Sequence, residues 1–365
     1  MSRPLRLLPA PSPLAHLRRP ARQLPFPLSH PDCRLYTRAR HGLWHGVRAL
    51  GLRPGDEVLV PAYHHGSEVE ALARAGLDCR YYAGTPGLEP DEEELAGLLG
   101  ERVRALHLTH YLGFPQDARR WRRWCDAHGL LLLEDAAQAW LSERDGLPAG
   151  ALGDCAIWCL YKTLPLPDGG ALMCRRPPTG PTAAPRWDLR GLARAHAGWL
   201  AGRWTPLGRV RARARRAAGT GPYDAAEDFA LGDPDAAPAR ATAWLLARLG
   251  TDAAARRRRS YTRLLERLAP LVPEPFRRLP DGASPFAFPV AVEDKAALVG
   301  ALGARDVEMV DLWRVPHPSL AADAFPAAAR LRATVAVLPV HQDLGAADTA
   351  RIAEAVRAAV PVPRL

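Results

Sequence analysis

The stretches LLLLEDAAQAW (Leu130–Trp140) and GDCAIWCLYKTLPLPDGG (Gly153–Gly170) decide how the rest of this chain is interpreted. The first opens with four leucines, a run too short for a helix and bounded by a glycine before it and two acids after it, which predicts a buried strand. Asp135 then stands at the carboxyl end of that strand. In open α/β sheets this edge is where ligands bind.

The second stretch carries an apolar run, Ala156 to Tyr161, which leads to Lys162. Of the 49 Lys and Arg residues in the chain, only Lys162 and Lys295 are lysines. A guanidinium cannot replace an amine that must lose its proton, as in a Schiff base. A strand-end acid followed by a lysine on a neighbouring strand is what pyridoxal phosphate (PLP) chemistry requires. Taken alone, the two residues fit a helix-capping aspartate and a surface lysine equally well.

Motifs around these two residues favour the first interpretation, because five of them follow one another in a fixed order. They are GDEVLVPAY (Gly55–Tyr63), HYLGFPQD (His110–Asp117), EDAAQA (Glu134–Ala139), GD (Gly153-Asp154) and LYKTLPLPDGG (Leu160–Gly170). In this order they resemble the DegT/DnrJ/EryC1/StrS family, PLP-dependent aminotransferases that act mostly on sugar nucleotides. The resemblance is strong over Leu50–Cys174, is lost after it, and returns more weakly from Ala239 to the C-terminus.

Alternating apolar runs and helical patterns predict an α/β fold, with a mostly parallel sheet flanked by helices. The resemblance implies the large domain of PLP fold type I followed by a smaller α+β C-terminal domain. We therefore expect an N-terminal arm (1–35), a PLP-binding domain (36–238, with a divergent insert at 176–238) and a small domain (239–365). A single long helix is expected from Ala239 onward, since apolar residues recur there at helical spacing.

The resemblance also implies roles for individual residues. Lys162 would hold PLP, and Asp135 would keep the pyridine nitrogen protonated. Gln138, one helical turn beyond Asp135, would contact the phenolic oxygen of the ring. His65 would stack on the pyridine, although a loop histidine exposed to water is the open alternative. No metal site is expected.

The phosphate cradle departs from the family pattern. The family's Gly-Thr pair at a helix start is replaced by Ala39 and Arg40, so Arg40, or Thr37 just upstream, is the candidate phosphate ligand. Cys159 stands where the family often has serine, and the interval from Asp154 to Lys162 is shorter than usual. The chain contains no asparagine, so the family's asparagine contact to the neighbouring subunit's cofactor cannot be carried over.

Composition limits the other possibilities. The net charge is +10, yet the basic residues form no recognisable nucleic-acid motif, and no nucleic-acid partner is expected. The clusters Arg209–Arg216 and Arg256–Arg259 are either solvated helix faces or contacts to an anion. No apolar run is long enough to span a membrane, and prolines break the N-terminus before a signal sequence can form. Six scattered cysteines without a CxxC pair predict reduced thiols and a cytoplasmic location.

The predicted function is amino transfer from glutamate or glutamine to a keto group of a nucleotide-linked sugar or a related secondary-metabolite intermediate. The abundance of arginine favours an anionic acceptor. The resemblance implies a homodimer with the active site at its interface. Two alternatives stay open: another PLP-dependent enzyme of the same fold, such as a lyase or a condensing enzyme, or a catalytically silent member with a binding or regulatory role.

Overall fold

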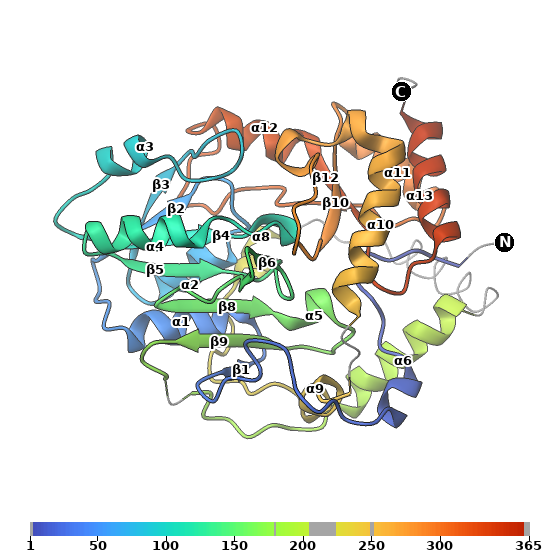
Figure 1. Ribbon diagram of the computed structural model, residues 1–365, viewed down its shortest axis with the longest axis horizontal. Coiled ribbons are helices and arrows are strands. Elements are labelled where there is room, and N and C mark those ends of the chain that lie inside the picture. Colours follow the sequence, from blue (N-terminus) through green and yellow to red (C-terminus); the bar gives the residue numbers. More distant parts are fainter. Residues whose placement is uncertain (1–2, 179, 204–223, 249–251, 361–365) are drawn as a thin grey trace.

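The structure is a computed structural model and describes residues 3–178, 180–203, 224–248 and 252–360. A large mixed sheet with helices on both faces forms one part of the molecule, and a three-stranded sheet with long helices forms the other (Figure 1). The predicted α/β fold with a mostly parallel sheet is confirmed. In the described residues, no helix has the length and apolar character needed to cross a bilayer. The cluster Arg209–Arg216 lies outside them.

The large sheet has the strand order β1-β9-β8-β5-β4-β2-β3. Its strands are β1 (Arg34–Tyr36), β2 (Glu57–Pro61), β3 (Asp78–Tyr82), β4 (Val103–Thr109), β5 (Leu131–Asp135), β8 (Cys155–Cys159) and β9 (Gly170–Cys174). Strands β2, β3, β4, β5 and β8 are parallel, whereas β9 is antiparallel to both β8 and β1. Because parallel strands end at one edge, Thr109, Asp135 and Ile157 lie in register there.

Helices cover both faces because each central strand is apolar on both sides. In β2, Val58 and Val60 face one core, and Leu59 faces another that contains Trp121. The helices of this part are α1 (Ala39–Ala49), α2 (Ser67–Arg74), α3 (Glu92–Gly97), α4 (Ala118–Ala127), α5 (Leu160–Thr163), α6 (Leu189–Arg203) and α8 (Ala225–Phe229), with short turns η1 (Pro13–Leu17) and η2 (Tyr111–Gly113) and a hairpin of β6 (Glu143–Arg144) and β7 (Leu147–Pro148). Helices α1 and α2 pack on the first core, α3 and α4 on the second.

The C-terminal part is built on an antiparallel sheet of order β10-β12-β11. Its elements are α10 (Ala253–Leu268), η3 (Ala269–Leu271), η4 (Glu274–Phe276), β10 (Ala287–Ala291), α11 (Lys295–Ala304), β11 (Val310–Asp311), α12 (Pro326–Thr334), β12 (Val335–Pro339) and α13 (Ala346–Ala359). Its core also contains Leu5 and Leu7 from the N-terminal arm and Tyr63 and Tyr111 from loops of the large sheet. The two parts therefore share one apolar core.

The single long helix expected from Ala239 is wrong. The structure has α9 (Arg240–Leu246) and, separately, α10, which begins at Ala253. Asp168 holds the start of α9, since its carboxylate accepts hydrogen bonds from the Ala239 N–H and the Thr242 hydroxyl. Leu245 and Leu246 pack with Trp158 beside β8 and β9. The helical spacing predicts both helices, but α9 ends at Leu246 in a turn and packs beside β8 and β9, whereas α10 begins separately at Ala253.

A buried arginine ties the C-terminal part to the helix that carries Lys162. Arg257 of α10 is 1% exposed, and its Nη2 donates to the carbonyls of Lys162 and Thr163 at 3.2 and 2.6 Å. Its other N–H groups donate to Gln342 Oε1 and to the carbonyls of residues 285 and 286. All five donors of the guanidinium are thus used. Within the cluster Arg256–Arg259, Arg257 is therefore neither part of a solvated helix face nor a contact to an anion.

A second contact between the two parts passes through a neutral histidine. The ring of His64 is fully buried; its Nδ1 donates to the Pro61 carbonyl at 3.0 Å, and its Nε2 accepts a hydrogen bond from the His317 N–H at 3.2 Å. Arg332 Nη2 donates to the carbonyls of Ala62 and His64 at 2.7 and 3.3 Å. Burial lowers the pKa of His64 to about 4, so the ring stays neutral and can accept. These bonds hold the loop that precedes α2.

Replacing Arg257 with leucine should destabilise the protein strongly, because several buried carbonyls and the Gln342 amide would lose their donor. We expect a loss on the order of 3 to 5 kcal/mol in the free energy of unfolding, measured by urea denaturation. The exposed neighbour Arg259 is the matched control, and Arg259→Leu should change stability by less than about 0.5 kcal/mol. Equal effects of the two variants would contradict the assigned role.

Protonation of His64 should weaken the folded state. Between its usual pKa of 6.5 and the folded value of about 4, the unfolded chain binds a proton at His64 that the folded chain does not. The free energy of unfolding should therefore fall as the pH falls through this window, by roughly 3 kcal/mol from this residue alone. Chemical denaturation at a series of pH values measures it.

In that series, His64→Gln keeps a hydrogen-bond acceptor and removes the titration, so its stability should depend less steeply on pH than that of the wild type. His128→Gln, at an exposed position, is the control and should follow the wild-type curve. Parallel curves for wild type and His64→Gln would show that His64 is not the titrating group.

Candidate functional site

A cavity of about 160 Å³ lies at the carboxyl edge of the parallel strands, between the end of β5, helix α5 and the start of α1. The structure brings all the site residues of the predicted set to its wall: Ala39, Arg40, His65, Asp135, Gln138, Cys159 and Lys162. The alternative phosphate ligand Thr37 does not line it. Residues up to 123 positions apart in the sequence therefore converge because parallel strands end together.

Asp135 is the last residue of β5, and its side chain is 11% exposed. Its Oδ1 accepts a hydrogen bond from the Ala137 N–H at 2.8 Å, and its Oδ2 lies 3.9 Å from His107 Nε2. Burial raises the pKa of Asp135, while the charge of His107 opposes the rise. His107 Nε2 is buried and has no hydrogen-bond partner among the described residues. An anchored, buried carboxylate thus faces the cavity.

Lys162 lies on α5, a single helical turn that follows β8 directly. Burial by itself would lower the pKa of Lys162, but the neighbouring Cys159 and Tyr161 and the carboxylate of Asp135 outweigh it, and the pKa is raised. The carbonyls at the end of α5 accept hydrogen bonds from Arg257. The backbone that carries the amine is therefore fixed independently of the amine itself.

Gln138 and His65 complete the wall on either side. Gln138 Oε1 accepts a hydrogen bond from the Leu112 N–H at 2.9 Å, so the amide N–H₂ group is the part that can donate into the cavity. The His65 ring lies edge-on to Phe229, with centroids 5.9 Å apart, and its Nε2 is 3.4 Å from Asp228 Oδ2. The backbone of His65 is fixed because its N–H donates to Glu68 Oε1.

The start of α1 reaches this cavity because glycine follows Asp168. A Cβ at Gly170 would clash with backbone atoms of Arg38 and Ala39. The Gly169 N–H, at a residue with φ +126°, also donates to the Thr37 carbonyl at 3.0 Å. Only glycine admits this close approach. The DGG end of the motif therefore sets the distance between the first turn of α1 and Lys162.

The first turn of α1 offers hydrogen-bond donors of the kind that suit an anion. Its N-cap residue, Arg38, makes no side-chain cap, and the turn contains no acid, so its backbone N–H groups lack a side-chain acceptor. The guanidinium of Arg38 lies over the Tyr161 ring at 5.2 Å and lines the cavity. Arg40 is used otherwise: its Nη1 donates to the carbonyls of Asp228 and Ala230, at 2.7 Å each. The Thr37 hydroxyl donates to a carbonyl at residue 236.

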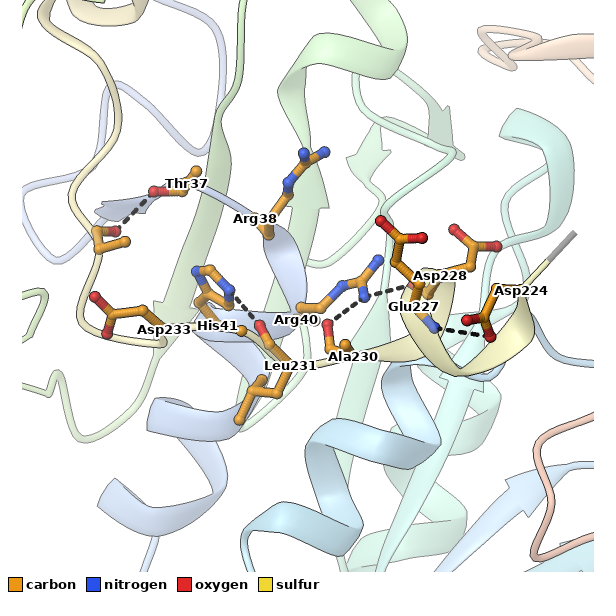
Figure 2. A pocket seen from close by; sticks show the side chains of 12 residues that line it. Thr37, Arg38, Arg40, His41, Asp224, Glu227, Asp228, Ala230, Leu231 and Asp233 are labelled. Atoms are coloured by element: carbon orange, nitrogen blue, oxygen red, sulfur yellow. Dashed lines mark hydrogen bonds between the residues drawn. The ribbon is translucent and has the colours of Figure 1, made fainter. Parts of the chain in front are cut away.

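Figure 2 shows a second, wider cavity of about 690 Å³. Arg38, Arg40 and Asp228 line both cavities, so the two are neighbours. Helix α8 supplies an acidic wall with Asp224, Glu227 and Asp228, whereas α1 supplies the two arginines. The wider cavity can therefore bind a large polar molecule that carries both anionic and hydroxyl groups.

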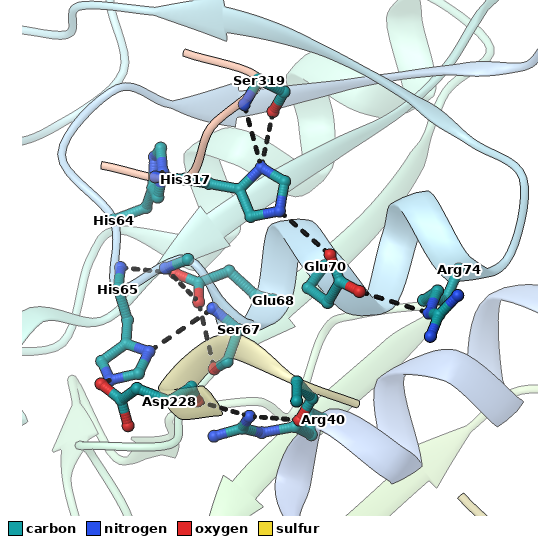
Figure 3. A network of polar contacts seen from close by, with 12 residues as sticks. Arg40, His64, His65, Ser67, Glu68, Glu70, Arg74, Asp228, His317 and Ser319 are labelled. Atoms are coloured by element: carbon teal, nitrogen blue, oxygen red, sulfur yellow. Dashed lines mark hydrogen bonds and ion pairs between the residues drawn. The ribbon is translucent and has the colours of Figure 1, made fainter. Parts of the chain in front are cut away.

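Figure 3 shows the polar network behind His65. The Glu68 carboxylate accepts hydrogen bonds from the backbone N–H groups of His65 and Gly66 at 3.0 and 3.2 Å, and so caps the start of α2. His317 of the C-terminal part lies 3.1 Å from Glu70 and contacts Ser319. The loop carrying His65 is thus fixed from both parts of the molecule.

The sequence analysis missed Arg38 and Glu68, which line the cavity, and His107, which is buried beside Asp135 without lining it. Arg38 had a usable signal, since it directly precedes the helical face that begins near residue 39. Glu68 resembled an ordinary first-turn acid of a helix, and His107 a core residue of an apolar strand. Only the fold shows that both lie beside the strand-end carboxylate.

The site offers distinct groups at separate points: a primary amine, a buried carboxylate, an amide donor and an uncapped helix start with a guanidinium. This set fits PLP, whose aldehyde, ring nitrogen, phenolic oxygen and phosphate need these partners. His107 Nε2 is buried beside Asp135 and has no hydrogen-bond partner among the described residues. An unpaired buried polar atom at this place fits a site in which Asp135 makes further polar contacts to a bound group. Within the described residues, no cluster of His, Cys, Asp and Glu suits a metal ion.

Known proteins resemble this chain in sequence over one part and in fold over nearly all of it. A dTDP-4-dehydro-2,3,6-trideoxy-D-glucose 4-aminotransferase from Saccharopolyspora spinosa is 31% identical over 134 residues, which are 36% of this chain and 35% of that protein. The match thus spans about a third of that relative's length. An aminotransferase, TlmJ, from Streptoalloteichus hindustanus has a TM-score of 0.65 at 23% identity, covering 90% of this chain and 85% of its own.

The protein NtdA from Bacillus subtilis, solved with bound cofactor PMP, has a TM-score of 0.62 at 16% identity, covering 90% of this chain and 73% of its own. Likenesses at such identities establish the fold, which is that of the PLP fold type I enzymes. Residues 35–184, which include Lys162 and Asp135, match the model of the DegT/DnrJ/EryC1/StrS aminotransferase family. Over these 150 residues, which are less than half of the chain, the protein is similar to the DegT/DnrJ/EryC1/StrS aminotransferase family.

Proposed function

We propose that this protein is a PLP-dependent aminotransferase that moves an amino group from glutamate or glutamine to the keto group of a nucleotide-linked sugar. The observation that carries the proposal is that Lys162 and Asp135 face one small buried cavity at the ends of adjacent strands. The relative from Saccharopolyspora spinosa, named as a sugar 4-aminotransferase, supports the same assignment. An intact lysine, aspartate and glutamine set disfavours a silent, regulatory member.

The residues divide the work by position. When bound, PLP supplies a ring that accepts electrons from a bond broken at the substrate carbon. Asp135, anchored by the Ala137 N–H, would hold the proton on the ring nitrogen. Lys162 would bind the cofactor covalently and, once released, carry a proton at Nζ between substrate and cofactor carbon. Gln138 would donate its amide N–H to the phenolic oxygen.

The phosphate would be bound at the start of α1. The backbone N–H groups of Ala39 and Arg40 lack a side-chain acceptor there, and Arg38 adds a guanidinium. Arg40 would contribute through its backbone, because its side chain is held by the carbonyls that follow α8. Cys159 lies at the cavity wall, but a thiol is a weak donor, so it replaces the family's serine poorly.

The acceptor would extend into the wider cavity. The guanidinium of Arg38 suits a phosphate oxygen, whereas the carboxylates of Asp224 and Glu227 suit the hydroxyl groups of a sugar. A nucleotide-linked keto sugar carries both kinds of group. This combination favours it over a simple keto acid, which has no hydroxyls for the acidic wall.

We further infer a homodimer with the site near its interface, which is supported by the similarity of residues 35–184 to the aminotransferase family. A cytoplasmic location stays a prediction from the cysteine pattern; all six thiols are unpaired in the structure.

Borohydride reduction of the holoenzyme, followed by peptide mass mapping, should place a phosphopyridoxyl group on Lys162. The other lysine, Lys295, serves as an internal control, because its amine is held by Asp311 and the Arg332 carbonyl outside the cavity. Lys295→Arg should leave the label in place, and Lys162→Arg should abolish it. A label on Lys295, or on neither lysine, would refute the cofactor assignment.

The assignment of Arg38 to the phosphate can be separated from general effects by comparing two ligands. Arg38→Gln should weaken PLP binding to the apoprotein by roughly ten-fold or more, since a charge-assisted hydrogen bond is lost. Its affinity for pyridoxal, which lacks the phosphate, should stay unchanged; fluorescence titration measures both. Arg40→Gln is the matched control and should alter the two affinities alike. A selective loss of PLP in Arg40→Gln instead would reverse the assignment.

The substrate is tested by absorbance. Glutamate or glutamine should convert the bound cofactor to its aminated form, and a nucleotide-linked keto sugar should restore the original spectrum. If only simple keto acids restored it, the sugar assignment would be wrong while amino transfer stood. If the donor were consumed with no acceptor aminated, the protein would be a lyase or condensing enzyme of the same fold.

A further inference from the structure

Exposed apolar side chains gather on one region of the molecule, outside the cofactor cavity. Among the described residues the most exposed large ones are Leu14, Leu17, Trp187, Leu189, Leu200 and Trp244. They come from the N-terminal arm around η1, from the start and body of α6, and from α9. Leu17 is 81% and Leu189 67% exposed, so these side chains stand out from the surface. None of them lines the cavity of Lys162.

Hydrogen bonds join these segments into a single surface, which we call the arm–α6–α9 surface (residues 11–22, 186–200 and 240–248). His196 Nδ1 contacts a backbone carbonyl at 3.0 Å, and its Nε2 lies 3.0 Å from His16 Nε2. The Ala21 N–H donates to the Ala247 carbonyl at 2.7 Å, and the first residue of α9 donates to the Arg186 carbonyl at 3.0 Å. In Figure 1 these elements lie together at the lower right.

The same surface is strongly basic. Within residues 11–22, 186–200 and 240–248 the sequence has one acid, Asp188, whose carboxylate accepts a hydrogen bond from the Gly191 N–H near the start of α6. Asp252 and Asp343 lie at the border of the surface, where they line a cavity together with Leu14 and Arg18. The exposed arginines of the surface are Arg18, Arg19, Arg22, Arg186, Arg190 and Arg240. The Arg248 guanidinium lies 3.5 Å from the centre of the Trp244 ring. Burial, and then the positive charge of His196 and Arg248, lowers the pKa of His16.

This combination narrows the choice of partner. A second copy that met this surface about a two-fold axis would bring arginines against arginines, because the arginines of the surface outnumber Asp188 and the bordering Asp252 and Asp343. Nucleic acid would neutralise the positive charge of the arginines. It offers no apolar environment, however, to leucine side chains that are more than half exposed. An anionic lipid surface satisfies both: leucines and tryptophans enter the interface, while guanidinium groups contact the headgroups.

We propose that the arm–α6–α9 surface binds the headgroup region of a bilayer that contains anionic lipid. The protein would lie on this membrane without spanning it, held by single leucine and tryptophan side chains and by the surrounding arginines. The proposal does not depend on the proposed aminotransferase function, because the surface shares no residue with the cofactor cavity.

The test is co-sedimentation of the full-length holoenzyme with vesicles, at several salt concentrations. The wild type should bind vesicles of phosphatidylcholine with about one third phosphatidylglycerol, less so as salt rises, and should not bind pure phosphatidylcholine. Leu14→Ser with Leu17→Ser should lower the partition coefficient roughly ten-fold or more. Arg18→Gln with Arg19→Gln should lower it by about five-fold per arginine.

The matched control is Arg119→Gln with Arg123→Gln, which removes the same charge from exposed positions of α4 and should leave at least most of the binding in place. Sedimentation velocity without lipid tests the alternative that the partner is a second copy of this chain. The proposal is overturned if the leucine variant binds vesicles like the wild type, or if neutral vesicles bind as well. It is also overturned if the leucine variant dissociates an oligomer, or if RNA is bound in place of vesicles.

Discussion

The buried guanidinium of Arg257 is the contact on which the arrangement of the site depends. It brings a charge into the apolar core of the C-terminal part without an ion-paired carboxylate, and burial lowers its pKa to about 9. The charge is tolerated because every N–H has an oxygen acceptor, two of them the carbonyls at the end of α5. One side chain thus fixes the turn that carries Lys162 to α10, to the two residues before β10 and to Gln342.

Close backbone packing on the other side of the same turn completes this arrangement. Gly169 and Gly170 let the strand before α1 pass next to β9, which brings an uncapped helix start to the cavity that contains Lys162. Together these contacts fix the separation between Lys162 and the first turn of α1. The proposed covalent and phosphate contacts of the cofactor require such a fixed separation.

Charge is distributed unevenly over the rest of the chain, with consequences for both proposed binding regions. Acids and arginines alternate at the cavities, where Asp228 faces His65 and the Arg40 guanidinium is held by carbonyls. On the arm–α6–α9 surface the arginines outnumber the acids and lie among exposed leucines. A mixed-charge pocket recognises a polar small molecule, whereas a cationic apolar surface fits an extended anionic one.

The sequence by itself determined the α/β fold and placed Asp135, Gln138 and Lys162 at the carboxyl edge of the sheet, because strand periodicity and motif order are local properties. It did not show that Arg257 is buried, since an arginine run on a helix has the same pattern whether one member faces solvent or core. The sequence also could not show which of Arg38 and Arg40 has its guanidinium free of the carbonyls that follow α8. Only the tertiary structure decided that, because the carbonyls that engage Arg40 lie nearly 190 residues away along the chain.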